Sequence, residues 1–235
     1  MPADRHFTAS PSSAPCLLHE LQSDGSVGAD PEQARDLARW RRAERDRLMA
    51  ARLAMSAGER SAHAQAIIAG LDALVTSTAT TVVSVYWPIR GEPDLRPWMH
   101  ALALRGAGVA LPVALGLGRA LEFREWHPGA RMARGLWKIP YPAEGARVVP
   151  SVVIAPLVGF DAGCYRLGYG GGFFDRTLAA MAAAPPLAIG VGYTDAELPT
   201  IFPQPYDMAM RWIVTPAGTR GPAAARTPEG RLAAT

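Results

Sequence analysis

Lysine is almost missing from this chain of 235 residues. Lys138 is the only lysine among 24 basic residues, so the other 23 are arginine. A Walker A phosphate loop needs a Gly-Lys pair, and the sequence contains none. A Schiff-base lysine would have to be Lys138, which lies in a stretch rich in proline and tryptophan. We therefore expect any phosphate to be held by arginine, backbone N–H groups or a metal ion.

Cysteine and long apolar runs are also scarce. Cys16 and Cys164 are too few for a disulfide framework or a cysteine-based zinc site. The histidines form no HExxH motif, no GxSxG elbow is present, and no run of about 18 apolar residues predicts a transmembrane helix. Residues 1–30 lack the continuous apolar stretch of a secretory signal, so we expect a cytoplasmic protein. The net charge of +3 suits an anionic ligand but is too small to require nucleic acid.

The chain divides into a long central part and two ends of different composition. Residues 1–30 and 217–235 are rich in small and polar residues without periodicity, which predicts a disordered N-terminal extension and a disordered C-terminal tail. Residues 31–216 are long enough, and the chain is hydrophobic enough at 49%, to form a single domain with a substantial core.

Two helices are predicted to precede alternating strands and helices. The first, residues 31–55, opens at Pro31 and is dense in arginine; the second, residues 56–74, opens with a Ser56–Glu59 capping box. Apolar runs then predict strands at 81–89, 108–115, 120–127, 147–160, 187–193 and 210–216, and helices at 94–107 and 174–184. The order predicts an α/β fold with three layers, α/β/α, around a mostly parallel central sheet in which 147–160 is a central strand.

The stretch "RLGYGGGFFDR", residues 166–176, is expected between a strand and a helix, where backbone N–H groups collect anions. Arg166 has the bidentate geometry that neutralises phosphate. Asp175 beside a phosphate is repulsive unless a cation lies between them, which suggests Mg²⁺. The alternative is an ordinary glycine-rich turn in which Asp175 caps the following helix.

The longer stretch "PLVGFDAGCYRLGYGGGFFDR", residues 156–176, resembles the signature of the 5-formyltetrahydrofolate cyclo-ligase family. Further stretches agree in order, and the resemblance covers roughly residues 36–216; they are "RWRRAERDRLMAARLAMSAGER", "VYWPIRGEPDL", "LPVA", "GLWKIPYP" and "TIFPQPYDMAMRWIVT". The resemblance implies an ATP- and Mg²⁺-dependent cyclisation of 5-formyltetrahydrofolate to 5,10-methenyltetrahydrofolate, in which the formyl oxygen is phosphorylated and ADP and phosphate are released. The sequence offers no obvious nucleophile, as expected when catalysis depends on positioning and charge neutralisation.

The resemblance also implies a nucleotide site. Arg41 and Arg45 match two basic helix positions that bind phosphates, although Arg39 and Arg42 compete for that role and a generic basic face is the alternative. Arg166 and Asp175 are implied as catalytic, and the complete nucleotide set is Arg41, Arg45, Arg166, Gly168, Tyr169, Gly170, Gly171, Gly172, Phe173, Phe174 and Asp175. Three positions depart from common family residues, namely Arg41 for lysine, Gly171 for a lysine in some members, and Arg211 for an acidic residue.

Folate and metal residues follow from the same resemblance. Glu92 in "RGEPD" matches a glutamate that contacts the pterin, and a carboxylate suits an amino-pyrimidinone edge. The aromatic residues Trp87, Trp137, Tyr141 and Phe173 are expected to enclose the ring, or else to belong to the core. Asp175 and Asp207 are implied as Mg²⁺ ligands, with a solvated loop residue as the alternative for Asp207.

Two other functional interpretations stay open. The arginine-rich helix is compatible with nucleic-acid binding, but no stacking motif or known module accompanies it. The departures at Arg41, Gly171 and Arg211 are compatible with a family member that binds folate or nucleotide without turnover. We expect a monomer that acts on a reduced folate and ATP, without nucleic-acid or membrane partners.

Overall fold

The computed structural model describes residues 31–76 and 78–221. The predicted N-terminal extension and most of the predicted tail lie outside the described residues. The boundary at 216 is wrong, because Gly218–Arg220 form a strand, β11, that pairs with β10. No helix of the described part is long and apolar enough to cross a membrane.

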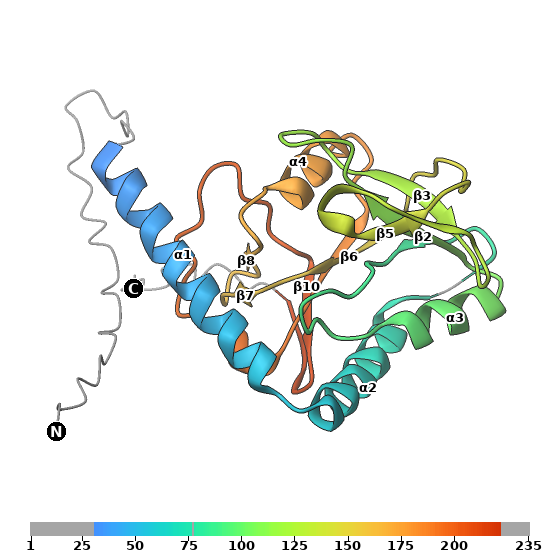
Figure 1. Cartoon of the computed structure of the whole chain (residues 1–235), viewed down its shortest axis with the longest axis horizontal. Helices are drawn as coiled ribbons and strands as arrows, with labels where there is room; N and C mark the ends of the chain where they lie inside the picture. Colours follow the sequence, from blue (N-terminus) through green and yellow to red (C-terminus); the bar gives the residue numbers. More distant parts are fainter. Residues whose placement is uncertain (1–30, 77, 222–235) are drawn as a thin grey trace, which may run out of the picture.

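A seven-stranded sheet forms the centre of the protein, in the order β11-β10-β9-β6-β1-β2-β3. Its strands are β1 (Val82–Ser84), β2 (Gly108–Val113), β3 (Glu122–Trp126), β6 (Val152–Pro156), β9 (Leu187–Val191), β10 (Trp212–Thr215) and β11. Figure 1 labels β10, β6, β2 and β3 of this sheet. The five inner strands are parallel, and only β3 and β11 at the edges run antiparallel. The middle strand β6 is almost wholly buried, as expected of an apolar strand covered on both faces.

Helices cover both faces of this sheet, as predicted. They are α1 (Pro31–Ala54), α2 (Ala57–Leu74), α3 (Arg96–Leu104) and α4 (Phe173–Ala180). One core cluster joins Trp40 of α1 and Leu178 of α4 to Val153 of β6. The other joins Leu71 of α2 and Trp98 of α3 to Ile154, the next residue of β6. Successive strand residues therefore face opposite cores, which makes the fold a three-layer α/β/α structure.

Two short hairpins and two 3₁₀ turns lie outside the main sheet. Strands β4 (Met132–Arg134) and β5 (Pro140–Pro142) pair around the turn Leu136–Lys138, and β7 (Gly159–Phe160) pairs with β8 (Arg166–Leu167). A second turn spans Thr194–Ala196. The predicted strands 81–89 and 147–160 are shorter than expected, because the chain leaves the sheet after Ser84 and after Pro156.

Candidate functional site

The two segments with the most distinctive residues follow neighbouring parallel strands. Strand β1 pairs with β6, and their carboxyl ends lead into the segment with Glu92 and the segment with the glycine loop, residues 168–172. The next strand after β1 lies on one side of it and β6 lies on the other, so this is a topological switch point of the sheet. Ligands of open α/β sheets bind in such places.

Helix α1 contributes three arginines, of which Arg45 and Arg52 contact the glycine loop and Arg41 contacts the loop 201–207. Arg41, Arg45 and Arg52 are spaced by four and seven residues, which places them on one helical face. Arg41 and Arg52 are buried, whereas the competing Arg39 is exposed and pairs with Asp36 on its own helix. The helix therefore uses its arginines to contact the rest of the domain.

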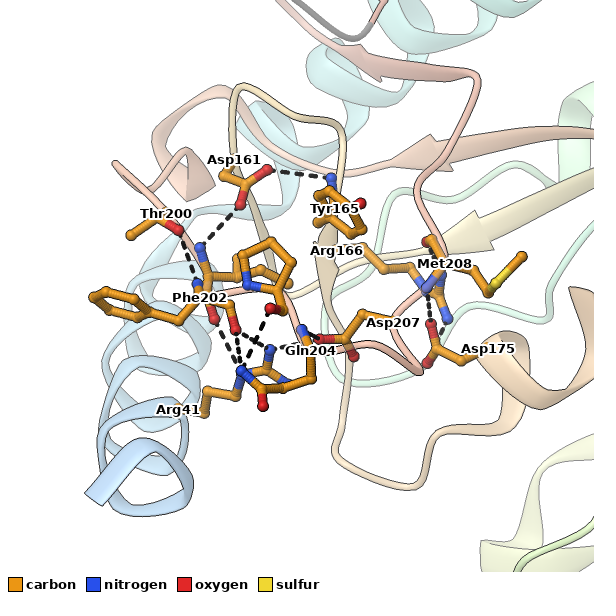
Figure 2. Close-up of polar contacts among 12 residues, drawn as sticks. Arg41, Asp161, Tyr165, Arg166, Asp175, Thr200, Phe202, Gln204, Asp207 and Met208 are labelled. Atoms are coloured by element: carbon orange, nitrogen blue, oxygen red, sulfur yellow. Dashed lines mark hydrogen bonds and ion pairs between the residues drawn. The ribbon is translucent and has the colours of Figure 1, made fainter. Parts of the chain in front are cut away.

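Arg41 is bound by the loop 201–207 (Figure 2). Its guanidinium donates to the carbonyls of Ile201 at 3.0 Å and Phe202 at 2.8 Å, and to Asp207 Oδ2 at 2.6 Å. Both side chains of the Arg41–Asp207 ion pair are only 10% exposed. The predicted phosphate ligand thus also holds the loop that carries a predicted metal ligand.

Arg45 lies against the glycine loop. Its Nε donates to the carbonyl of Gly168 at 2.7 Å, and a Cβ at Gly170 would lie 3.5 Å from its guanidinium carbon. Gly170 and Gly172 have φ angles of 93° and 61°, where a side chain would be strained, so these two positions favour glycine. Burial, and then the nearby charge of Arg41, lower the pKa of the Arg45 guanidinium.

Arg166 and Asp175 form an ion pair of 2.9 Å between β8 and the first turn of α4 (Figure 2). The other carboxylate oxygen of Asp175 accepts from the backbone N–H of Met208 at 3.1 Å. The N-cap of α4 is Gly172, and no side chain caps it, so the capping alternative for Asp175 is wrong. The guanidinium of Arg166 lies 5.5 Å from the centre of the Phe174 ring, and burial lowers the pKa of this guanidinium.

The bond from Met208 brings the two predicted metal ligands close together, because Asp207 is the preceding residue. Mg²⁺ is typically held by one or two carboxylates together with substrate phosphates. Among the described residues, the donors to Asp207 all reach Oδ2, which leaves Oδ1 available, and the side chain of Asp175 is 19% exposed. The donor set therefore fits an ion shared with a nucleotide, while the described residues contain no group of three or more potential protein ligands.

Glu92 is buried, with 6% of its surface exposed, and both of its oxygens are bonded. Oε2 accepts from the backbone N–H of Ile89 at 2.9 Å, and Oε1 accepts from the hydroxyl of Tyr169 at 2.8 Å. Burial raises the pKa of the Glu92 carboxyl to about 7, and the bond from Ile89 opposes this rise most strongly. The segment before Glu92 turns through Arg90 and Gly91, both at positive φ.

The four predicted ring-binding aromatics do not lie together. Trp137 is 59% exposed and contacts Phe173 edge to face, with ring centroids 5.4 Å apart. Trp87 instead packs against the core cluster of α2 and α3, with Arg96 over its ring. Tyr141 lies in β5 under the guanidinium of Arg124. Trp137 and Phe173 form a pair beside the glycine loop, whereas Trp87 is half-buried and packs against a core cluster.

Two residues at the site were missed in the sequence. Arg52 donates to the carbonyl of Leu157 at 2.7 Å and to the hydroxyl of Tyr169 at 3.1 Å. Asp161 accepts from the backbone of Gly163 and Tyr165 and from Ile201, which fixes the loop that binds Arg41 (Figure 2). Arg52 could have been found from the sequence, because it lies seven residues after Arg45 and therefore on the same helical face. No sequence pattern indicated Asp161, because its partner Ile201 is 40 positions away.

Comparisons with known proteins agree on one family. The profile of the 5-formyltetrahydrofolate cyclo-ligase family matches residues 37–216. A 5-formyltetrahydrofolate cyclo-ligase of Mycolicibacterium smegmatis is 34% identical over 165 residues, which cover 67% of this chain and 84% of the relative. The enzyme of the same name from Escherichia coli K12 is also 34% identical, over 57% of this chain and 78% of its own.

Solved structures are similar in the same way. The 5,10-methenyltetrahydrofolate synthetase of Aquifex aeolicus superposes with a TM-score of 0.67 at 27% identity, covering 82% of this chain and 98% of that one. The synthetase of Mycoplasma pneumoniae gives 0.61 at 23% identity over 75% and 98% of the two chains, a likeness of fold.

Proposed function

The chain belongs to the 5-formyltetrahydrofolate cyclo-ligase family, and from that membership we propose how its site works. The protein is a ligase that converts 5-formyltetrahydrofolate to 5,10-methenyltetrahydrofolate. ATP is the proposed co-substrate and Mg²⁺ the proposed metal, with ADP and phosphate as products. One observation carries the proposal: a glycine loop bordered by buried arginines contacts a buried carboxylate, Glu92, through Tyr169.

The arginines and the glycine loop form the proposed phosphate site. Arg45 fixes the loop through Gly168, and the loop's backbone N–H groups supply neutral donors to the phosphates. Arg166, buried beside Asp175, supplies a fixed positive charge next to the place where charge develops on the transferred phosphoryl group. Because both groups are fixed beforehand, little reorganisation is needed when the phosphoryl group moves.

Glu92 and the Trp137–Phe173 pair form the proposed folate site. Ionised Glu92 accepts hydrogen bonds from the amino-pyrimidinone edge of the pterin, and the two rings cover a flat face. The formyl oxygen then attacks the γ-phosphorus of ATP, ADP leaves, and N10 attacks the activated carbon as phosphate departs with that oxygen. The side chains named here position the reactants, and none of them acts as a nucleophile.

Asp175 and Asp207 are the proposed Mg²⁺ ligands. When bound, the ion would neutralise charge on the phosphate oxygens. Both carboxylates are paired with arginine, Asp175 with Arg166 and Asp207 with Arg41. These guanidinium groups hold the carboxylates in place before a nucleotide arrives.

The test is turnover by the purified full-length chain. 5-Formyltetrahydrofolate, ATP and MgCl₂ are mixed with the protein, and the methenyl product is followed by its ultraviolet absorbance. We expect product only when all three are present, and loss of the signal when any one is omitted. Binding of folate or ATP without product, by a protein that is folded by circular dichroism, would replace the proposal with the non-catalytic alternative.

The expectations of a monomer, a cytoplasmic location and no nucleic-acid partner belong to the same proposal. They rest on the small-molecule substrates and the modest net charge of +3. Light scattering at assay concentration checks the first of them.

A further inference from the structure

Tyr169 connects the glycine loop to the folate side of the site. Its neighbour Gly168 is held by Arg45 through the backbone, while its own side chain reaches Glu92 at 2.8 Å. Tyr169 is itself 40% exposed, but it contacts a carboxylate that is almost fully buried. One residue of the phosphate loop therefore completes the surroundings of a group on a different segment, 77 positions earlier in the chain.

The direction of the bond is fixed by Arg52. A guanidinium is only a donor, so the Tyr169 oxygen must accept the bond of 3.1 Å from Arg52 Nη1. The single hydroxyl proton is then left for Glu92. Arg52 is itself fixed by its second bond to the Leu157 carbonyl at 2.7 Å, and it is only 4% exposed. The order Arg52, Tyr169, Glu92 is a chain of hydrogen bonds with one polarity, in which each donor strengthens the next.

Groups from α1, from the turn before Glu92 and from the glycine loop act on the Glu92 carboxylate. Burial disfavours the ionised carboxylate, and the bonds from Ile89 and Tyr169 and the charges of Arg52 and Arg90 favour it. Tyr86 and Tyr193 are neutral at physiological pH, because burial raises the pKa of each hydroxyl. Tyr169 is the only side-chain hydroxyl that donates to the carboxylate among the described residues.

We propose that Tyr169, supported by Arg52, is a positioning residue that keeps the carboxylate of Glu92 ionised and oriented for the pterin. The inference rests on the proposed function for the identity of the ligand, but not for the hydrogen-bond chain. Its consequence is that the folate site is complete only while the glycine loop lies against Glu92. A single hydroxyl group in the phosphate loop thereby sets the affinity for the other substrate.

The experiment compares two tyrosine variants of the full-length chain. Tyr169→Phe removes the hydroxyl that donates to Glu92. Tyr193→Phe removes a hydroxyl that donates at 2.8 Å to the carbonyl of Gly91, the residue next to Glu92, and leaves the carboxylate's bonds intact. Binding of 5-formyltetrahydrofolate is measured by calorimetry across neutral pH, and the KM values for folate and ATP are measured in parallel.

A lost donor disfavours the ionised carboxylate, so ionisation of Glu92 should require a higher pH in Tyr169→Phe. We expect the midpoint of the folate Kd against pH to rise by roughly one pH unit, which weakens binding roughly fivefold at pH 7. The two proteins should converge at alkaline pH, and the KM for ATP should change little. Tyr193→Phe should keep the wild-type midpoint. A midpoint that moves equally in both variants, or in neither, overturns the inference.

A second readout does not depend on folate. The carboxyl carbons of glutamate are labelled with ¹³C in the unliganded full-length chain, and the Glu92 signal is assigned by its loss in Glu92→Gln. An upward shift of its titration midpoint in Tyr169→Phe alone supports the inference even if the protein binds no folate, in which case only the proposed function fails. If Glu92→Gln weakens folate binding while the Tyr169→Phe titration stays at the wild-type position, only the inference fails.

Discussion

The guanidinium of Arg166 lies 2.9 Å from the carboxylate of Asp175, with 4% of the arginine side chain exposed and 19% of the aspartate. The arginine is therefore fixed inside the protein, whereas the carboxylate reaches its surface. Arg166 is held further by the carbonyl of Met208 at 3.4 Å, and Asp175 by the N–H of the same residue. This arrangement presents an acidic group to a ligand while its counter-charge stays in place.

Replacing Asp175 with asparagine should affect both catalysis and stability. We expect turnover to fall at least about 100-fold, because charge on the phosphoryl group loses its counter-ion, and added Mg²⁺ should recover part of it. Stability should fall by about 1–3 kcal/mol, because Arg166 is left without a charged partner. The rate is measured against MgCl₂ concentration, and stability by urea denaturation.

Asp36→Asn is the matched control for this change. Asp36 also pairs with an arginine, Arg39, but both side chains are exposed on α1. It should change neither rate nor stability appreciably. Near wild-type turnover of Asp175→Asn at ordinary Mg²⁺ would reduce Asp175 to a structural partner of Arg166.

Arg41→Lys tests whether the guanidinium of Arg41 is needed to hold the loop 201–207. A lysine has one ammonium group and cannot reproduce the planar fork that binds Ile201, Phe202 and Asp207 together. We expect a loss of about 1–2 kcal/mol in the free energy of unfolding, since a buried carbonyl loses its donor. Chemical denaturation measures the loss, and the exposed Arg39→Lys on the same helix should show none. Equal stability of Arg41→Lys and the wild type would contradict the role of Arg41 in holding the loop.

Glu92 should make the stability of the protein depend on pH. Its folded pKa is raised to about 7, so its favourable contribution is complete below its ordinary pKa near 4.5 and is lost as pH rises through 7. The stability of the wild type relative to Glu92→Gln should therefore fall by on the order of 2–3 kcal/mol between those limits. Urea denaturation of both proteins at several pH values measures this difference. A difference that stays constant with pH would show that the pKa of Glu92 is the same in the folded and unfolded protein.

Trp137→Ala tests the aromatic side of the folate site. The ring is 59% exposed and its aromatic partner is Phe173, so its removal should leave the melting temperature nearly unchanged. We expect the KM for 5-formyltetrahydrofolate to rise roughly three- to tenfold, the equivalent of one aromatic contact. Trp137→Phe should retain much of the affinity, because it keeps a flat ring. An unchanged KM in Trp137→Ala would remove this residue from the site.

The fold was predictable wherever local patterns decide it. The Ser56–Glu59 capping box is present as predicted, with both reciprocal hydrogen bonds formed. The apolar run around Val152–Pro156 is the central strand, because only a strand covered on both faces is apolar throughout. The hairpin β7–β8 was missed, since two-residue strands leave no periodicity in a sequence.

The sequence predicted positions for the site but not the contacts that these residues make. Resemblance to the family indicated Arg41, Asp175 and Asp207, yet their pairing with Ile201, Met208 and one another depends on the tertiary fold. Trp87 stays a prediction. An aromatic residue next to a predicted ligand-binding turn suits either a pocket or a core, and Trp87 packs against the cluster of α2 and α3 while part of its surface stays exposed.

The arginines of α1 set an order of events for a chain emerging from the ribosome. Helix α1 is the first described element to be synthesised, but the partners of its arginines come much later in the chain. Leu157 follows Arg52 by 105 residues, and Asp207 follows Arg41 by 166 residues. Contacts so distant in sequence form late, because a long loop must close first. A nascent chain that ends before residue 200 already contains β1, β2, β3, β6 and β9, while Arg41 still lacks its partners. We therefore expect the sheet to be assembled during synthesis and the substrate site only as translation finishes, so that a prematurely terminated chain has a core but no activity.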